Sequence, residues 1–224
     1  MELSVDTEAL LTNFASINQN MLFTEGSTIK TMSEARNVLA SATISEDIPR
    51  EFGIYDLNEF LRAIAIVNPS PNIKFEDDNV LLKDSSGRLK VKYFYSSKET
   101  LTYPNKDITM PTSDVSFVLE NDTFRKIKNA ASAFGHSEMS VSGSKDLLTL
   151  SVTDSQNATS NKFSIDVPGT SSSDNFNFIM SISNMKILPG DYDVTISSKL
   201  ISNFKHKDLN VQYWIALEKT STFE

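Results

Sequence analysis

The sequence predicts an α+β protein of two similar domains, from its length and from a pattern that recurs along it. Four segments carry apolar residues at helical spacing, and strand-like segments follow each of them. A chain of 224 residues suits two domains of ordinary size. A hydrophobic fraction of 39%, with 14 Phe, is enough to fill their cores. The repeat is one of structure rather than of sequence identity.

The first two helices are predicted at residues 6–17 and 55–67. Asp6 is the expected N-cap of the first, because a short acidic side chain can accept hydrogen bonds from the first turn. Asn68-Pro69 is expected to end the second, since a proline disfavours helix in the residue before it. The predicted apolar faces are Leu10, Phe14 and Ile17 in the first helix, and Leu57, Phe60, Leu61 and Ile64 in the second.

The other two helices are predicted at residues 121–134 and 181–188. Gly135 should end the third helix, because glycine adopts the left-handed conformation common after a helix. Pro189-Gly190 should end the fourth, which is short. The apolar stripe of the third helix is Phe124, Ile127, Ala131 and Phe134.

Strand segments alternate apolar and polar residues or are rich in β-branched residues, with polar turns between them. The predicted strands are residues 21–23, 28–32 and 38–44; then 72–75, 80–83 and 88–95; then 139–142, 147–153 and 162–167; and finally 192–198 and 211–217.

The domain boundary is predicted within a polar stretch near the middle of the chain. Residues 96–110, which include Tyr103-Pro104-Asn105-Lys106, have the composition of an interdomain connector. The predicted N-terminal domain is therefore residues 1–110, with this connector at its end, and the C-terminal domain is residues 111–224.

Composition argues against several classes of function. The net charge of -8 is opposite in sign to that of a conventional duplex binder, although it does not exclude a protein that encircles DNA. With no cysteine, the chain has no disulfide, thiol nucleophile or cysteine-ligated zinc, which suits a reducing cytoplasm. Neither a signal peptide nor a membrane span is visible, so no membrane association is expected.

We expect no catalytic centre, no cofactor and no metal site. The only histidines, His136 and His206, are predicted in an exposed turn and an exposed basic loop, and neither suggests a triad. Asp77-Asp78 and Asp191-Tyr-Asp193 are predicted to be turn acids, which are far more often solvated than metal-binding. A small hydrolase is therefore disfavoured, and the chain is not expected to be an enzyme.

Several segments resemble the sliding clamps of T-even-type bacteriophages, which are DNA polymerase processivity factors. They cover about a quarter of the chain, in the same order and at compatible spacing. They are residues 3–4 and 13–18, residues 54–61, residues 104–106, residues 175–180 running into 184–192, and residues 216–218.

The resemblance implies the DNA-clamp fold. Each of two domains would pack two helices on curved antiparallel sheets, and three subunits would form a ring around duplex DNA. The implied partners are two further copies of the chain, non-specifically bound DNA, the replicative DNA polymerase, a clamp loader and late-transcription factors, in the host cell cytoplasm on replicating viral DNA. The alternative is a β-rich structural component of a phage virion, which would not need its helices on one concave side.

The charges on the predicted helices favour the clamp interpretation. Acidic residues lie at the helix starts, where the helix dipole favours anions, and basic residues follow. This order is also usual for any stable surface helix, so it gains weight only together with the resemblance. The first helix has no basic residue. The residues expected to face DNA are Arg62, Arg125, Lys126, Lys128 and Lys186.

Two further surfaces follow from the resemblance alone. Subunits would join by pairing edge strands, residues 88–95 of one copy with residues 162–167 of the next, through Leu89, Val91, Tyr93, Phe163 and Ile165. A pocket for partner peptides would involve Tyr103, Pro111, Trp214 and Ile215. Trp214 lies in an alternating strand, so ordinary sheet packing explains it equally well.

Overall fold

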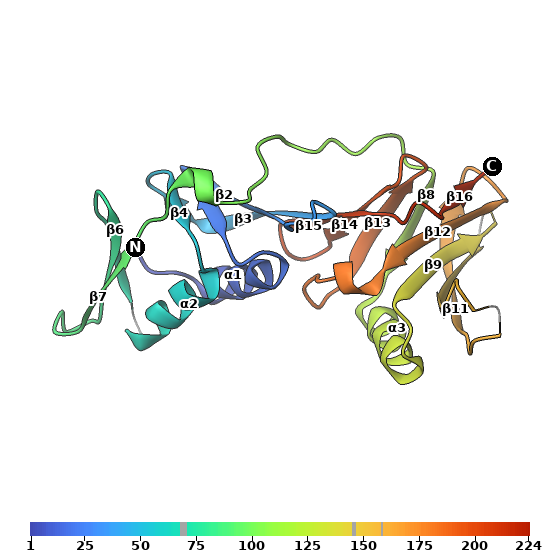
Figure 1. Cartoon of the computed structure of the whole chain (residues 1–224), viewed down its shortest axis with the longest axis horizontal. Helices are drawn as coiled ribbons and strands as arrows, with labels where there is room; N and C mark the ends of the chain where they lie inside the picture. Colours follow the sequence, from blue (N-terminus) through green and yellow to red (C-terminus); the bar gives the residue numbers. More distant parts are fainter. Residues whose placement is uncertain (68–70, 145–146, 158) are drawn as a thin grey trace. The chain divides into compact units, whose positions relative to one another are not determined.

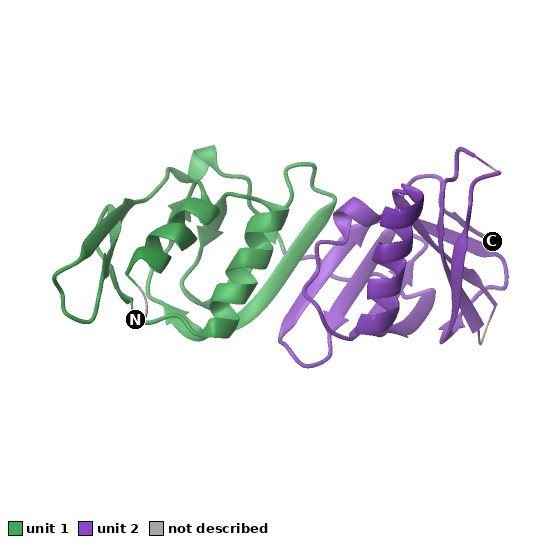
Figure 2. Cartoon of the chain, turned by 90° about the horizontal axis from the view of Figure 1, so that it is seen from below, with its two compact units in different colours: residues 1–106 green, residues 107–224 purple. Residues whose placement is uncertain are grey.

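The structure is a computed structural model, and it describes residues 1–67, 71–144, 147–157 and 159–224. The chain forms two compact units, Met1–Lys106 (unit 1) and Asp107–Glu224 (unit 2) (Figure 2). Residues 101–114 contain no helix or strand. The predicted boundary at residue 110 and the role of residues 96–110 as a connector stay predictions. The predicted helix end at Asn68-Pro69 lies outside the described residues.

In the described residues of unit 1, two α-helices and seven antiparallel strands pack around an apolar core. The helices contact each other and lie side by side (Figures 1 and 2). In sheet order the strands are β1-β4, β2-β3 and β5-β6-β7. The elements are α1 (Val5–Ile17), β1 (Met21–Phe23), β2 (Gly26–Met32), β3 (Val38–Ile48), β4 (Phe52–Ile54), α2 (Leu57–Ile66), β5 (Asn72–Phe75), β6 (Asn79–Lys83), β7 (Lys90–Phe94) and the short 3-10 helix η1 (Lys98–Thr100).

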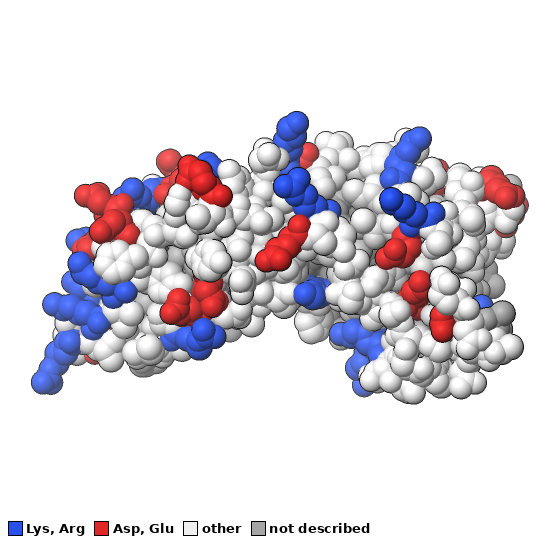
Figure 3. All heavy atoms as spheres, viewed as in Figure 1, with Lys and Arg blue, Asp and Glu red and all other residues white. Residues whose placement is uncertain are grey.

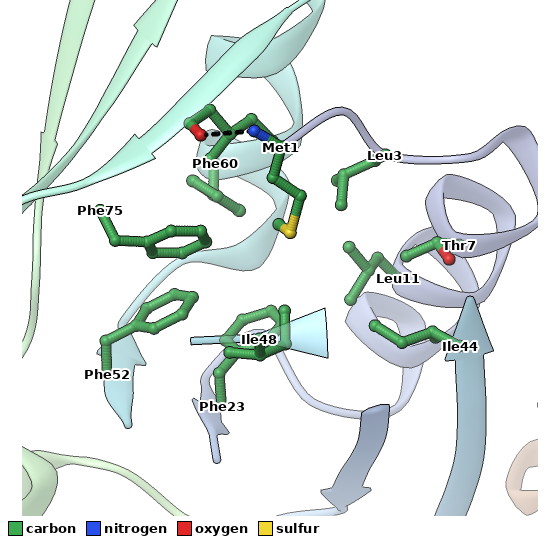
Figure 4. Close-up of a pocket in the computed structure, with 11 residues that line it drawn as sticks. Met1, Leu3, Thr7, Leu11, Phe23, Ile44, Ile48, Phe52, Phe60 and Phe75 are labelled. Atoms are coloured by element: carbon green, nitrogen blue, oxygen red, sulfur yellow. Dashed lines mark hydrogen bonds between the residues drawn. The ribbon is translucent and has the colours of Figure 1, made fainter. Parts of the chain in front are cut away.

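Aromatic side chains fill the middle of unit 1. The rings of Phe23 and Phe52 stack with centroids 4.6 Å apart, and Phe75 lies 5.3 Å from Phe52. Met1 reaches into the same apolar space, and its amino group donates to the Ile73 carbonyl oxygen at 3.0 Å (Figure 4). The space is lined by core side chains, so we interpret it as part of the core rather than as a binding site.

The start of α1 differs from the prediction. The N-cap is Ser4 rather than Asp6, and its hydroxyl accepts from the Thr7 amide. The helix begins earlier because Glu46, on β3, accepts hydrogen bonds from the Ser4 amide and from the Thr7 hydroxyl, the latter at 2.6 Å. A distant carboxylate thus supplies acceptors that the local sequence does not reveal.

Unit 2 is one long antiparallel sheet, with α3 packed on β10 and β11. Its strands follow the order β16-β12-β9-β10-β11-β8-β13-β14-β15. The elements are β8 (Val115–Leu119), α3 (Asn121–Phe134), β9 (Glu138–Gly143), β10 (Leu147–Thr153), β11 (Phe163–Ser171), β12 (Phe176–Ser181), the 3-10 helix η2 (Ile182–Asn184), β13 (Tyr192–Ser197), β14 (Ile201–His206), β15 (Val211–Ala216) and β16 (Thr222–Phe223).

The third helix is confirmed and the fourth is not. The helix α3 ends at Gly135, which is left-handed at φ 69° as predicted. At the fourth position only the single turn η2 forms. Met185 and Ile187 are buried while Lys186 between them is exposed, which is the alternation of an extended chain. Burying these two side chains stabilises the chain more than a short helix would, because a short helix is costly to nucleate.

His206 is also a correction, because it is buried rather than part of an exposed loop. Its Nδ1 accepts from the amides of Asp208 and Leu209, at 3.1 and 3.0 Å, and its Nε2 lies 3.2 Å from the Pro189 carbonyl oxygen. The imidazole therefore ties the turn after β14 to the segment before β13.

Candidate functional surfaces

The exposed face of α3 carries three of the five predicted DNA-facing residues. Its buried face is Thr123, Phe124, Ile127 and Ala131. Helical spacing then turns Arg125, Lys126 and Lys128 outward, and all three are exposed. Figure 3 shows Lys and Arg atoms gathered near this helix.

The cations of α3 have contacts within the helix. Asp122, one turn earlier, forms ion pairs with Arg125 and with Lys126, the second at 2.7 Å. Lys128 instead lies over the Phe124 ring, 4.6 Å from its centroid. Hydrogen bonds from Lys126 and Arg125 hold the pKa of Asp122 below its ordinary value, so this carboxylate stays ionised at neutral pH.

The start of α3 is held by the segment before β13. The N-cap Glu120 makes no capping bond through its side chain. Instead Asp191 accepts from the Asn121 amide at 2.8 Å, and the Asn121 side chain accepts from the Gly190 amide at 3.2 Å. Because Lys186 lies a few residues before this contact, the segment that carries it is anchored to α3.

The other two predicted DNA-facing residues lie on separate elements. Arg62 is exposed on α2 in unit 1, and Lys186 is exposed in the extended segment after η2. In the described part of the chain no acid forms an ion pair with Arg62. After its acidic first turn, the exposed positions of α1 are Ala9, Thr12 and Ser16, which are small and neutral.

The strands with an edge to which, among the described residues, no other strand is paired include β7 and β11. In unit 1, β7 pairs only with β6. In unit 2, β11 pairs with β10 along Phe163–Pro168 and with β8 only from Gly169 onward. The second edge of Phe163–Pro168 is therefore open.

The predicted interface residues lie on or beside these two edges. Val91, Phe163 and Ile165 are partly exposed, and Leu89, just before β7, is exposed. Tyr93 differs, because its ring packs edge-on against Phe60 of α2. Phe94, which was not among the predicted residues, is 62% exposed and points to the other face of β7. Its exposure comes from the edge position, which no local signal reveals.

The structure separates the residues predicted for the peptide pocket. Ile215 is fully buried in unit 2, while Trp214 is 9% exposed. Successive strand residues point to opposite faces, so these two side chains lie on different faces of β15, and the peptide pocket stays a prediction. The Trp214 indole N–H has no acceptor in the described part of the chain. Tyr103 and Pro111 are partly exposed.

The described ranges contain neither a cluster of metal ligands nor a helix that could cross a membrane. Those residues contain no group of three or more His, Asp or Glu side chains placed to hold a metal ion. Not one of their helices combines the length and the apolar content that a membrane crossing requires.

Known protein families and structures match nearly the whole chain. Residues 5–101 match the family model of DNA polymerase processivity factors, and residues 116–219 match that of the gp45 sliding clamp C-terminal domain. The sliding clamp of Escherichia phage RB69 is 31% identical over 232 aligned residues, which cover 100% of both chains. The chain belongs to the sliding clamp family of DNA polymerase processivity factors.

A second phage sliding clamp supports the same assignment, and a solved structure supports the fold. That of Vibrio phage KVP40 is 30% identical over 97% of this chain and 99% of its own. The crystal structure of PCNA from Thermococcus kodakaraensis superposes with a TM-score of 0.70, covering 95% of this chain and 96% of that one, at 12% identity. The predicted clamp fold is confirmed, and so is the predicted function as a sliding clamp. Family membership favours this function over the alternative of a virion component.

Proposed function

We propose that three copies of this chain form a ring around duplex DNA and tether the replicative DNA polymerase to it. The observation that carries the ring is that β7 in unit 1 and β11 in unit 2 each have an open edge with partly exposed apolar side chains. Exposed edges invite association, and pairing β7 of one copy with β11 of the next would cover both. Because the two edges differ, this contact is heterologous, and it forms a ring when the rotation between successive copies brings the third copy back to the first.

The proposed subunit contact places apolar residues of both strands together. Val91 and Leu89 of one copy would meet Phe163 and Ile165 of the next. The partial exposure of Val91, Phe163 and Ile165 supports this, because such side chains have surface left to bury. Tyr93 is assigned a supporting role beneath the edge, since its ring already packs on α2.

The DNA-facing surface is proposed to comprise Arg62, Arg125, Lys126, Lys128 and Lys186. Their exposure and the lack of further acids after the first turn of α3 support phosphate contacts without sequence readout. With a net charge of -8, the chain would not hold DNA by affinity alone. We infer that the closed ring retains the DNA and that the basic residues guide it.

The remaining partners are proposed from the same role. A clamp loader would open and close the ring, and late-transcription factors would use the loaded clamp, in the cytoplasm of the host cell. Trp214 is kept at the centre of the proposed peptide surface, with Tyr103 and Pro111. Tethering by a short peptide raises the local concentration of the polymerase, so no catalytic group in the clamp is needed. We also propose that the boundary between the two domains lies near residue 110.

The test is DNA synthesis on a primed circular template with the cognate polymerase and loader. Adding the wild-type protein should lengthen the products of single binding events. Arg125→Glu with Lys128→Glu should shorten them, because two cations of α3 would then repel phosphate. Products of unchanged length on adding the wild-type protein would overturn the proposed function.

The matched control reverses two lysines outside the helices. Lys74→Glu with Lys219→Glu makes the same change in net charge, and both side chains are exposed. This control should preserve product length. An equal loss in both double variants would remove α3 from the proposed DNA-facing surface.

A further inference from the structure

We propose that Asp122 acts as an intramolecular competitor of DNA phosphate, which weakens the grip of α3 on the duplex and thereby favours sliding. This inference rests on the proposed DNA-facing role of α3. The structural observation is that one carboxylate is shared by two of the three cations on the exposed face of that helix.

The geometry uses both oxygens of the carboxylate. Asp122 Oδ1 binds the guanidinium of Arg125, and Asp122 Oδ2 lies 2.7 Å from Lys126 Nζ. Asp122 is in the first turn of α3, and the cations follow at three and four positions, where side chains on one helix face meet. A phosphate that approaches Arg125 or Lys126 must therefore compete with the Asp122 carboxylate for the N–H donors of these two side chains.

The Asp122 carboxylate can exchange rapidly with DNA phosphate on the side chains of Arg125 and Lys126. The three side chains of the cluster remain between 49% and 68% exposed, so water and salt screen their attraction. An exposed pair of this kind contributes little stability, and phosphate can replace the carboxylate easily. Each contact that Arg125 or Lys126 makes with DNA then costs its contact with Asp122, which keeps the net gain in binding free energy small.

Arg62 on α2 shows that the arrangement on α3 is not general. The nearest preceding acid on its helix, Glu59, receives the Tyr93 hydroxyl at 3.1 Å rather than Arg62. Arg62 forms no ion pair within the described ranges. The structure thus assigns a full cation to α2 and a moderated cluster to α3.

The experiment measures binding of the whole protein to a short duplex with free ends, by fluorescence anisotropy over a range of salt. Asp122→Asn keeps the size of the side chain and removes its charge. We expect about threefold tighter binding at low salt and a steeper salt dependence, because freed cations make stronger phosphate contacts. The difference should vanish near 1 M salt, where the screening length is about 3 Å.

Glu120→Gln is the matched control. Glu120 precedes the same helix and is exposed, but its side chain makes no capping bond and no ion pair in the described part of the chain. It removes an equal charge at nearly the same place without freeing a cation, so it should change binding less than Asp122→Asn. Thermal unfolding of both variants checks that α3 remains folded.

The outcomes separate the two proposals. Tighter binding by Asp122→Asn than by Glu120→Gln, together with weaker binding by the Arg125→Glu and Lys128→Glu variant, supports the inference. If the double variant binds more weakly while Asp122→Asn and Glu120→Gln behave alike, the competitor role is wrong and the DNA-facing role of α3 stands. If the double variant binds like the wild type, both are wrong.

Discussion

At the scale of single residues, Gly190 is required by the buried ring of His206. Gly190 has a φ of 149°, which side chains rarely adopt, and a Cβ there would lie 2.1 Å from His206 Nε2. The ring cannot move freely, because its Nδ1 accepts from two backbone amides. The close approach therefore depends on the missing side chain.

We predict that Gly190→Ala lowers the free energy of unfolding by about 2–4 kcal/mol, through backbone strain and overpacking. Denaturant unfolding measures the change. Gly87→Ala is the matched control, because Gly87 also has positive φ, 68°, but a Cβ there would meet nothing within 4 Å. It should cost only about 1 kcal/mol. Equal costs would show that the His206 contact is unimportant.

Glu46 is the second residue whose role depends on its surroundings. Burial raises the pKa of its carboxyl, but the hydrogen bonds from Thr7 and Ser4 outweigh this and leave it below the ordinary value of 4.5. Because the folded-state pKa is the lower one, the stabilisation is complete above the ordinary value. It is lost as the pH falls through the folded-state pKa.

We predict that Glu46→Gln destabilises the protein at neutral pH by about 1–2 kcal/mol, since a neutral amide is the weaker acceptor. It should also flatten the loss of stability on acidification, as measured by denaturant unfolding at several pH values. Glu25→Gln, at an exposed position, is the control and should do neither. An unchanged acid profile in Glu46→Gln would argue against this role.

At the scale of elements, Tyr93 joins the edge strand β7 to α2. Its hydroxyl lies 3.0 Å from the Asp56 carbonyl oxygen and 3.1 Å from Glu59 Oε2. Burial and the neighbouring Glu59 raise the pKa of Tyr93, so the hydroxyl stays protonated and can donate. The strand proposed for subunit contact is thereby fixed against a helix proposed to face DNA.

We predict that Tyr93→Phe loosens β7 while leaving the rest of unit 1 folded. Loss of the hydrogen bond should cost about 1 kcal/mol and speed amide hydrogen exchange in β7. Tyr95→Phe is the control, because the Tyr95 hydroxyl donates to the Glu76 carbonyl oxygen and not to α2. Exchange in β7 that is slower in Tyr93→Phe than in the control would contradict the anchoring role.

Some elements were predictable from the sequence and others were not. The helix α3 was predicted because its apolar spacing and terminal glycine are local signals. The strand β14 was missed because its buried face is Ser202, Phe204 and His206, which is not an apolar pattern. The open edges of β7 and β11 are properties of strand order, which no single segment encodes.

At the scale of the whole molecule, the proposed ring depends on the open edge of β11. Ile165 is partly exposed there and is proposed to meet a neighbouring subunit. A carboxylate at this position would have to be buried in the contact without a partner, which is costly. The same substitution should matter little to a chain that remains a monomer.

We predict that Ile165→Asp converts the trimer into monomers at micromolar concentration, as measured by sedimentation. Gln156→Asp, in an exposed turn of the same unit, is the control for the added charge and should remain trimeric. Circular dichroism shows whether the variant is folded. A folded Ile165→Asp variant that stays trimeric would place the subunit contact elsewhere.

The α+β class, the helices α1, α2 and α3 and the clamp resemblance could all be predicted from the sequence, because helical periodicity, caps and short motifs are carried by neighbouring residues. Three features became visible only in the folded chain: Glu46 supports the start of α1, His206 is buried, and β7 and β11 each keep an edge open. These features join residues far apart in the chain. Their energies arise from burial and hydrogen bonds that exist only once the sheets have formed.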